Sequence, residues 1–145
     1  MTKRILTFSI LFLLAFSLSS CLKPGTIDNA EIDYGDSVMF TDAEIKSAAD
    51  AVLIKFEDFS GADLIRIWYD EEELTKETEG YISRGRGILK EAAEKGDIII
   101  LLSDFYVGSC GVEPGFNKDF TYTDWMWILI KDSETDEWAV YDWGY

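Results

Sequence analysis

The chain has 145 residues, a formal net charge of −15 and no histidine. A surface this acidic repels the phosphates of nucleic acids, so no nucleic-acid partner is expected; it suits a cationic partner or, as we favour, serves only solubility. The missing histidine excludes Ser-His and Cys-His catalytic pairs and the usual zinc and copper ligand sets, so we expect no metal and no other cofactor.

The first 20 residues have the three parts of an export signal. Lys3 and Arg4 precede an apolar run over residues 5–18, and small residues then lead to Cys21. This layout predicts a secretory signal peptide. The apolar run is shorter than the roughly 20 residues that a membrane-spanning helix needs, and polar side chains interrupt it.

The end of this segment, Leu18-Ser19-Ser20-Cys21, resembles the lipobox of bacterial lipoproteins. The resemblance implies cleavage of residues 1–20 and lipidation of the Cys21 thiol with a diacylglyceryl group, whose acyl chains are of the palmitate kind. Two acyl chains anchor a protein stably, whereas one binds a membrane only marginally. We therefore expect a lipid-anchored protein on the extracytoplasmic face of the cell membrane, with a plain secretory peptide as the alternative.

Residues 21–40 have the composition of an acidic tether. Pro24 and Gly25 are followed by scattered acids without a steady apolar period, which is typical of a flexible spacer. A weak alternation over residues 32–38 could add an edge strand. The predicted organisation is thus a signal peptide over 1–20, a lipid-anchored tether over 21–40 and a single domain over 41–145.

The most regular pattern in the chain begins at Thr41. Thr41-Asp42-Ala43-Glu44 matches a capping box, in which the Thr41 and Glu44 side chains satisfy each other's backbone N–H groups. Apolar residues then recur at helical spacing as far as Phe59, and Gly61 supplies a stop. The pattern predicts a helix from Asp42 to about Phe59 whose apolar face packs on a sheet.

The middle of the chain predicts one strand and weaker helices. Residues 64–69 alternate, which places Ile65, Ile67 and Tyr69 on one face of a strand. An acidic run at 70–73 then begins a second, shorter helix. A short helical piece is expected around 89–94.

Three further strands complete the predicted sheet. The continuous apolar run within 97–107 is typical of a central strand that is covered on both faces. Residues 121–131 and 138–143 alternate and are joined by a polar turn, which predicts a hairpin. The fold class is therefore α+β, with an N-terminal helix packed on an antiparallel sheet of about four strands and a second, shorter helix.

Three segments carry a resemblance to known proteins: residues 102–107, 122–129 and 140–145 resemble a group of small, uncharacterised lipoproteins from Gram-positive bacteria. The resemblance implies a shared fold over residues 41–145 but no activity. The order of elements is similar to that of cystatin-like and NTF2-like domains, which host many functions. Only Val107-Gly108 stands where cystatin-type protease inhibitors carry a glutamine-bearing hairpin motif, so protease inhibition is not predicted.

Few residues are candidates for catalysis. Asp104, Asp124 and Asp142 lie on predicted strands, and neighbouring carboxylates could raise one another's pKa for acid–base work or bind calcium. No calcium-loop spacing is present, and we favour structural or solvent-facing roles. Cys110 is the one free thiol candidate, but no cation lies closer in sequence than Lys118, so no reactivity is predicted.

A dense aromatic set gives the best functional hint. Trp125 and Trp127 share a predicted face and could meet Trp138 or Trp143 across the hairpin. Exposed aromatic side chains stack on sugars, peptides or partner proteins, although core packing explains most of such a set.

These observations together predict a membrane-anchored, non-catalytic binding or accessory domain. One alternative is a small-ligand or hydrolase-like NTF2-type pocket that uses the strand carboxylates. Another is a purely structural protein of the cell envelope. The partner beyond the membrane is not specified by the sequence.

Overall fold

The computed structural model describes residues 23–85, 87–109 and 115–145. The predicted signal peptide, the lipidation site Cys21 and the free thiol candidate Cys110 therefore lie outside the described residues. The helices and strands, in chain order, are β1 (Glu31–Asp33), α2 (Asp42–Phe56), β2 (Ala62–Tyr69), α3 (Glu71–Arg84), α4 (Ile88–Lys95), β3 (Ile98–Val107), β4 (Phe120–Lys131) and β5 (Trp138–Gly144).

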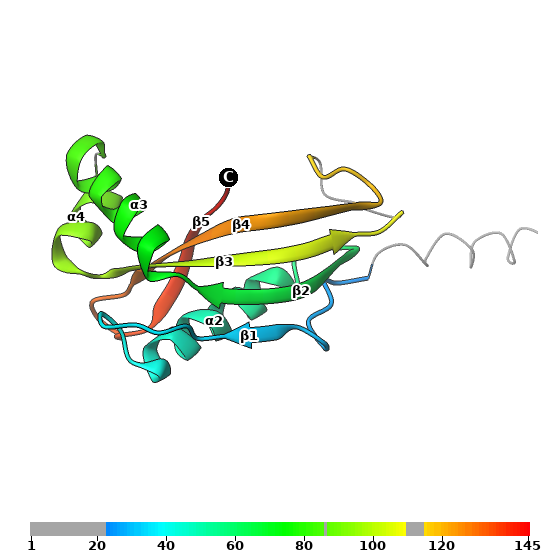
Figure 1. Cartoon of the computed structure of the whole chain (residues 1–145), viewed down its shortest axis with the longest axis horizontal. Coiled ribbons are helices and arrows are strands. Elements are labelled where there is room, and N and C mark those ends of the chain that lie inside the picture. The colour runs from blue at the N-terminus through cyan, green and yellow to red at the C-terminus, as the bar shows by residue number, and fades with distance from the viewer. Residues whose placement is uncertain (1–22, 86, 110–114) are drawn as a thin grey trace, which may run out of the picture.

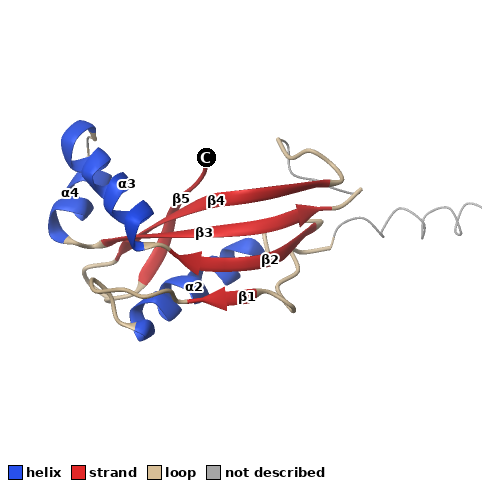
Figure 2. Cartoon of the chain, viewed as in Figure 1, coloured by secondary structure: helices blue, strands red, loops and turns tan. Residues whose placement is uncertain are grey.

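The described strands form one sheet in the order β1-β2-β3-β4-β5, so the α+β class is confirmed (Figures 1 and 2). The prediction of about four antiparallel strands is wrong, because residues 31–33 add a fifth, short strand that runs parallel to β2. These residues belong to the segment predicted as a tether, in which the weak alternation over residues 32–38 suggests an edge strand.

The helices also differ from the prediction. The helix α3 has 14 residues, almost the 15 of α2, so the second helix is not short. The Asp70 side chain stabilises its start by accepting hydrogen bonds from the N–H groups of Glu72 and Glu73. The helix α4, which ends directly before Gly96, confirms the short helical piece expected around 89–94. None of the helices in the described part is long and apolar enough to cross a membrane.

The capping box at the start of α2 is confirmed. Thr41 Oγ1 accepts the Glu44 N–H at 3.3 Å, and Glu44 Oε2 accepts the Thr41 N–H at 3.0 Å. The helix ends at Phe56, three residues before the predicted end, and a turn carries the chain to Phe59. Its predicted apolar face is buried on the sheet, with the side chains of Ile45, Ala48, Ala49, Val52 and Phe56.

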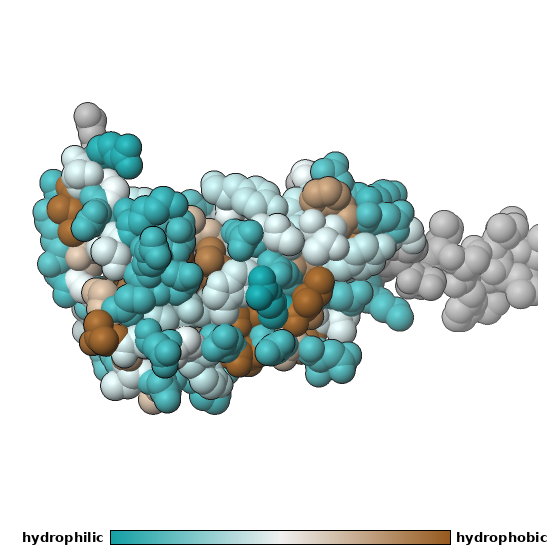
Figure 3. Space-filling view, in the orientation of Figure 1, coloured by the Kyte–Doolittle hydropathy of each residue, from teal (hydrophilic) through white to brown (hydrophobic). Residues whose placement is uncertain are grey.

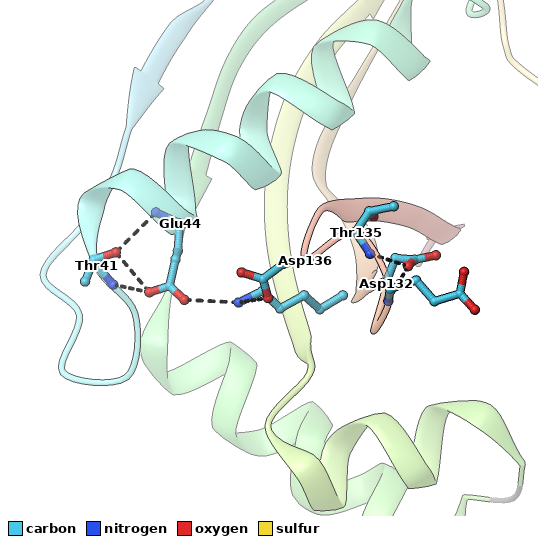
Figure 4. A network of polar contacts seen from close by, with 7 residues as sticks. Thr41, Glu44, Asp132, Thr135 and Asp136 are labelled. Atoms are coloured by element: carbon cyan, nitrogen blue, oxygen red, sulfur yellow. Dashed lines mark hydrogen bonds and ion pairs between the residues drawn. The ribbon is translucent and has the colours of Figure 1, made fainter.

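A polar network connects this end of α2 to the β4–β5 hairpin (Figure 4). Lys131 Nζ lies 3.5 Å from Glu44 Oε1 and 3.1 Å from Asp136 Oδ1. Within the turn, Asp132 Oδ1 accepts the N–H groups of Glu134 and Thr135. The hairpin is therefore held to the helix by one ammonium group between two carboxylates.

The two faces of the sheet are covered differently. The helix α2 crosses one face, where it buries Leu101, Trp127 and Leu129. The helices α3 and α4 lie at one end of the other face, where Ala92 and Ala93 of α4 pack with residues of β3 and β4 (Figure 1). As predicted, β3 is central and is buried on both faces for most of its length.

Each of three strands contains a shift of register that the alternation of the sequence does not reveal. The register shifts at Ile65 in β2 and at Tyr141 in β5. In β4 it shifts between Tyr122 and Trp125, the part of the strand that faces Asp104 of β3. Such a shift places one extra residue in a strand and reverses the alternation beyond it. In β4 the extra residue is accommodated by Asp124, whose φ of 55° lies in the left-handed region.

Because of these shifts, three side chains lie on another face of the sheet than the sequence predicts. Ile65 is 45% exposed and does not share the buried face of Ile67 and Tyr69. Tyr122 and Trp125, predicted on opposite faces, pack with ring centroids 5.6 Å apart. Trp143, predicted opposite Val140, lies with it on the α2 face.

Candidate functional site

The predicted catalytic carboxylate of Asp104 is committed to structural contacts. It is 9% exposed, and its Oδ2 accepts a hydrogen bond of 2.7 Å from Arg66 Nε. Its Oδ1 accepts the backbone N–H of Asp124 at 3.0 Å. Both oxygens therefore stabilise the point at which the register of β4 shifts.

The other two candidate carboxylates do not join Asp104 in a common site. The Asp124 side chain is exposed, and only its backbone N–H contacts Asp104. Asp142 is also exposed and pairs with Ile128, four residues along β4 from Asp124. At about 3.3 Å per residue, this separation is about 13 Å. Among the described residues, no group of three potential metal ligands is found.

Two of the four candidate tryptophans belong to the core. Trp127 is fully buried and donates its Nε1–H to Ser103 Oγ at 2.8 Å. Trp138 is 6% exposed and packs edge-on against Phe40, with ring centroids 5.7 Å apart. Their burial leaves no face for a ligand.

The other two tryptophans, Trp125 and Trp143, line a pocket of about 350 Å³. The pocket lies on the α2 face of the sheet, between the C-terminal end of α2, the segment before β4 and the end of β5. Trp143 is 39% exposed there, so part of its ring is accessible to a ligand. The remaining principal lining residues are Lys55, Asp58, Phe59 and Phe116.

The aromatic walls of this pocket come from segments far apart in the sequence. Phe59 packs with ring centroids 5.3 Å from Phe116 and 6.1 Å from Trp143. Phe116 lies 5.6 Å from Trp125. Trp125 lies on the face of Phe59 through plain alternation with Trp127, whereas Trp143 reaches this face through the register shift in β5. The shift in β4 adds Tyr122 to the same face, with its ring centroid 5.6 Å from that of Trp125.

Three polar groups stand among these rings. Lys55 Nζ lies 4.6 Å from the centroid of the Trp143 ring and 2.8 Å from Asp58 Oδ2. The Nε1–H of Trp125 is buried and has no hydrogen-bond partner in the part of the chain that the structure describes. A buried donor without an acceptor is costly, and sites that bind ligands are one place where such groups occur.

A second concavity, of about 320 Å³, lies between α4 and the hairpin. Its walls are mainly aliphatic, with Ile88, Ile130 and Val140, and Tyr141 stands at its margin with 48% exposure. It has one aromatic ring, against four in the pocket at the other end of β5.

The sequence predicts two of the four aromatic residues that line this pocket. It singles out Trp125 and Trp143, whereas Phe59 belongs to the apolar pattern of the predicted helix and no pattern singles out Phe116. A single phenylalanine in a glycine-rich loop was the available signal. No local pattern in the sequence shows that the ammonium group of Lys55 lies over a ring of β5.

Comparison with protein-family models, with curated proteins and with solved structures gives no match for this chain. The geometry of the pocket therefore carries the functional argument.

Proposed function

We propose that this chain is a membrane-anchored extracytoplasmic lipoprotein, held by a lipid on Cys21, whose domain is a non-catalytic binding module. We place its ligand in the pocket that Phe59, Phe116, Trp125 and Trp143 surround. The observation that carries the proposal is the exposed ring of Trp143 in a concave, aromatic site.

The dimensions and chemistry of the pocket support a small ligand. Its volume of about 350 Å³ falls within the range of roughly 300–1,000 Å³ that small-molecule sites occupy. Four aromatic residues line it, of which Trp143 is the most exposed large hydrophobic, and Lys55 and Asp58 add the few polar groups that orient a ligand.

We further propose a cystatin-like or NTF2-like arrangement and membership of the lipoprotein group that the sequence resembles. A long helix packed across antiparallel strands supports this assignment. The parallel strand β1 and the helix pair α3–α4 at one end of the sheet are additions to such a plan.

The hydrolase-like alternative has less support from the geometry. It requires a carboxylate that is free to exchange a proton in a pocket. Asp104 is paired with Arg66 and with the backbone of β4, while neither Asp124 nor Asp142 lines the aromatic pocket.

A thermal-shift screen of small molecules tests the binding function on the full chain. A ligand at about 100 times its dissociation constant stabilises a protein by about 2.7 kcal/mol, which raises the Tm of a domain of this size by roughly 10 °C. We expect Trp143→Leu to abolish the shift. Tyr141→Leu, which alters a similarly exposed aromatic of the same strand, should preserve it. A ligand that protects both variants equally would place the site elsewhere.

The lipid anchor is tested by replacing its attachment residue. We expect Cys21→Ala to abolish incorporation of labelled palmitate and to release the chain from the membrane fraction. Cys110→Ala, which removes the other thiol, should change neither. Membrane attachment that survives Cys21→Ala would contradict the anchor without bearing on the pocket.

A further inference from the structure

The pocket already holds one ammonium group, that of Lys55. Its Nζ lies 4.6 Å from the ring centroid of Trp143 and 2.8 Å from a carboxylate oxygen of Asp58. An indole face and a nearby carboxylate are the groups that proteins use to bind alkylammonium ligands. Lys55 thus shows that this part of the pocket accommodates an ammonium group.

The other aromatic residues that line the pocket also favour a cation. Phe59, Phe116 and Trp125 surround the cavity that lies beside the Lys55–Trp143 contact. Aromatic faces carry a negative potential, so several rings around one cavity favour a cation whose surface is partly apolar. A methylated ammonium group has both properties, because its charge is spread over an apolar surface.

The charge of the whole chain points in the same direction. The sequence has 28 acidic and 13 basic residues. Such a surface concentrates cations near the protein and repels anions. Inside the pocket, Lys55 and Asp58 neutralise each other, so a cation that replaces the Lys55 ammonium restores the same balance.

Lys55 can give up its position at little cost. Its side chain is 33% exposed and that of Asp58 is 66% exposed, so this ion pair is open to solvent. Exposed pairs of this kind contribute little to stability. A displaced lysine side chain also regains the rotamer freedom that it loses in the contact.

We propose that the pocket recognises an alkylammonium group, of the trimethylammonium type, which replaces the Lys55 ammonium on the ring of Trp143. This inference rests on the proposed binding function and adds the chemical class of the ligand. It requires no covalent step.

Three probes of nearly equal shape test the charge requirement. Choline is cationic, 3,3-dimethylbutan-1-ol is its neutral isostere and 3,3-dimethylbutanoate is the anionic counterpart. Each is titrated into the full chain in a neutral detergent at constant ionic strength, and the change in tryptophan fluorescence is followed. We expect choline to bind about tenfold more tightly than the neutral isostere, and the anion to bind most weakly.

Variants of the pocket give the second arm of the test. Trp143→Leu should weaken choline binding at least tenfold, whereas Tyr141→Leu should leave it unchanged. Lys55→Met keeps the aliphatic stem but removes the internal competitor, so it should tighten choline binding about threefold. Asp58→Asn should weaken it by a similar factor, since it removes the carboxylate that faces the cation.

The outcomes separate the ligand class from the binding function. Equal affinities for choline and its neutral isostere, both sensitive to Trp143→Leu, would overturn the inference and leave the binding function supported. Tightest binding of the anion, lost in Lys55→Met, would also overturn it, because Lys55 would then be the recognition group. Failure of all three probes overturns the inference, and failure of the wider screen to yield any Trp143-dependent ligand would overturn the binding function as well.

Discussion

A lysine and a tryptophan are in contact near each end of α2, but the two contacts have different surroundings. At each end a lysine ammonium lies over a tryptophan of β5: Lys131 is 5.5 Å from the ring of Trp138, and Lys55 is 4.6 Å from the ring of Trp143. At the first end Lys131 also bridges two carboxylates, and Trp138 is 6% exposed. At the second end the only carboxylate partner of Lys55 in the described chain is Asp58, and Trp143 is 39% exposed.

This difference shows that a cation on an aromatic ring is not by itself a sign of function. At the end of α2 near Trp138, which we call the closed end, the contact is surrounded by packing and by the network of Figure 4, so it stabilises the fold. At the end of α2 near Trp143, which we call the open end, a cavity adjoins the lysine–tryptophan contact, so a ligand can compete for it. Burial of the ring and the number of charged partners distinguish the two roles.

The largest expected difference between the ends is in the stability of the domain. Trp138→Ala should lower the free energy of unfolding by roughly 3–5 kcal/mol, because a buried indole leaves a cavity in the core. Trp143→Ala should cost only about 1–2 kcal/mol, since part of the ring is already in solvent. Urea denaturation of both variants measures the contrast, and equal losses would mean that Trp143 is a core residue.

The lysines should differ in the same sense by a smaller amount. Lys131→Met should destabilise the domain by about 1 kcal/mol, because two carboxylates lose a shared partner at a side chain only 22% exposed. Lys55→Met should stay within about 0.5 kcal/mol of the wild type. The same urea experiment distinguishes them, and a larger loss at Lys55 would reverse the assignment of structural and ligand-binding ends.

The closed end should also contribute to the pH dependence of stability. Hydrogen bonds from the backbone and side chain of Thr41, and the nearby Lys131, lower the pKa of Glu44 below its ordinary value of 4.5, against a smaller effect of burial. A lowered pKa stabilises the fold above pH 4.5, and this stabilisation is lost as the pH falls through the folded-state value. Glu44→Gln should therefore flatten the acid side of the stability curve, whereas Asp58→Asn is the control at the open end.

On the basic side of the curve the sign is opposite. The hydrogen bond that Lys131 donates to Asp136, together with the charges of Asp136 and Glu44, raises the pKa of Lys131 above 10.5 and outweighs a smaller effect of burial. This stabilisation is complete below pH 10.5 and is lost as the pH rises through the folded-state value. Lys131→Met should remove that loss, and thermal melts between pH 9 and 12, a range set to bracket lysine ionisation, would show it.

The smallest expected effect is on choline affinity when the closed end is altered. Lys131→Met should change the dissociation constant by less than about twofold, because Lys131 lies at the far end of α2 from the pocket. Lys55→Met should change it in the tightening direction. A comparable response to both variants would indicate that choline senses the total charge of the protein and not the pocket.

The elements fixed by local chemistry could be predicted from the sequence. The capping box at Thr41 and the periodic apolar face of α2 both depend on residues within one helix. The continuous apolar run of β3 likewise indicates burial on both faces. In each case the information lies within a few consecutive residues.

The register shifts could not be predicted, because each depends on the neighbouring strand. Nothing near Asp124 in the sequence shows that its N–H bonds to Asp104, which lies 20 residues earlier. The faces of Tyr122 and Trp143 follow from these shifts. The sequence could therefore name two tryptophans of the pocket, but not the phenylalanines that complete it.

The register shift at Tyr141 makes the pocket depend on the length of a strand as well as on its composition. Deleting that one residue would remove the bulge and leave Trp143 paired with Trp127 on the α2 face. Inserting one further residue after it, with the bulge kept, would instead turn Trp143 toward the face of α3 and α4. The pocket would lose a wall although every tryptophan was still encoded. Among relatives of this chain, the in-frame insertion of a single codon in β5 is thus a route by which the ligand site is lost, and an alignment scored on residue identity alone would overlook it.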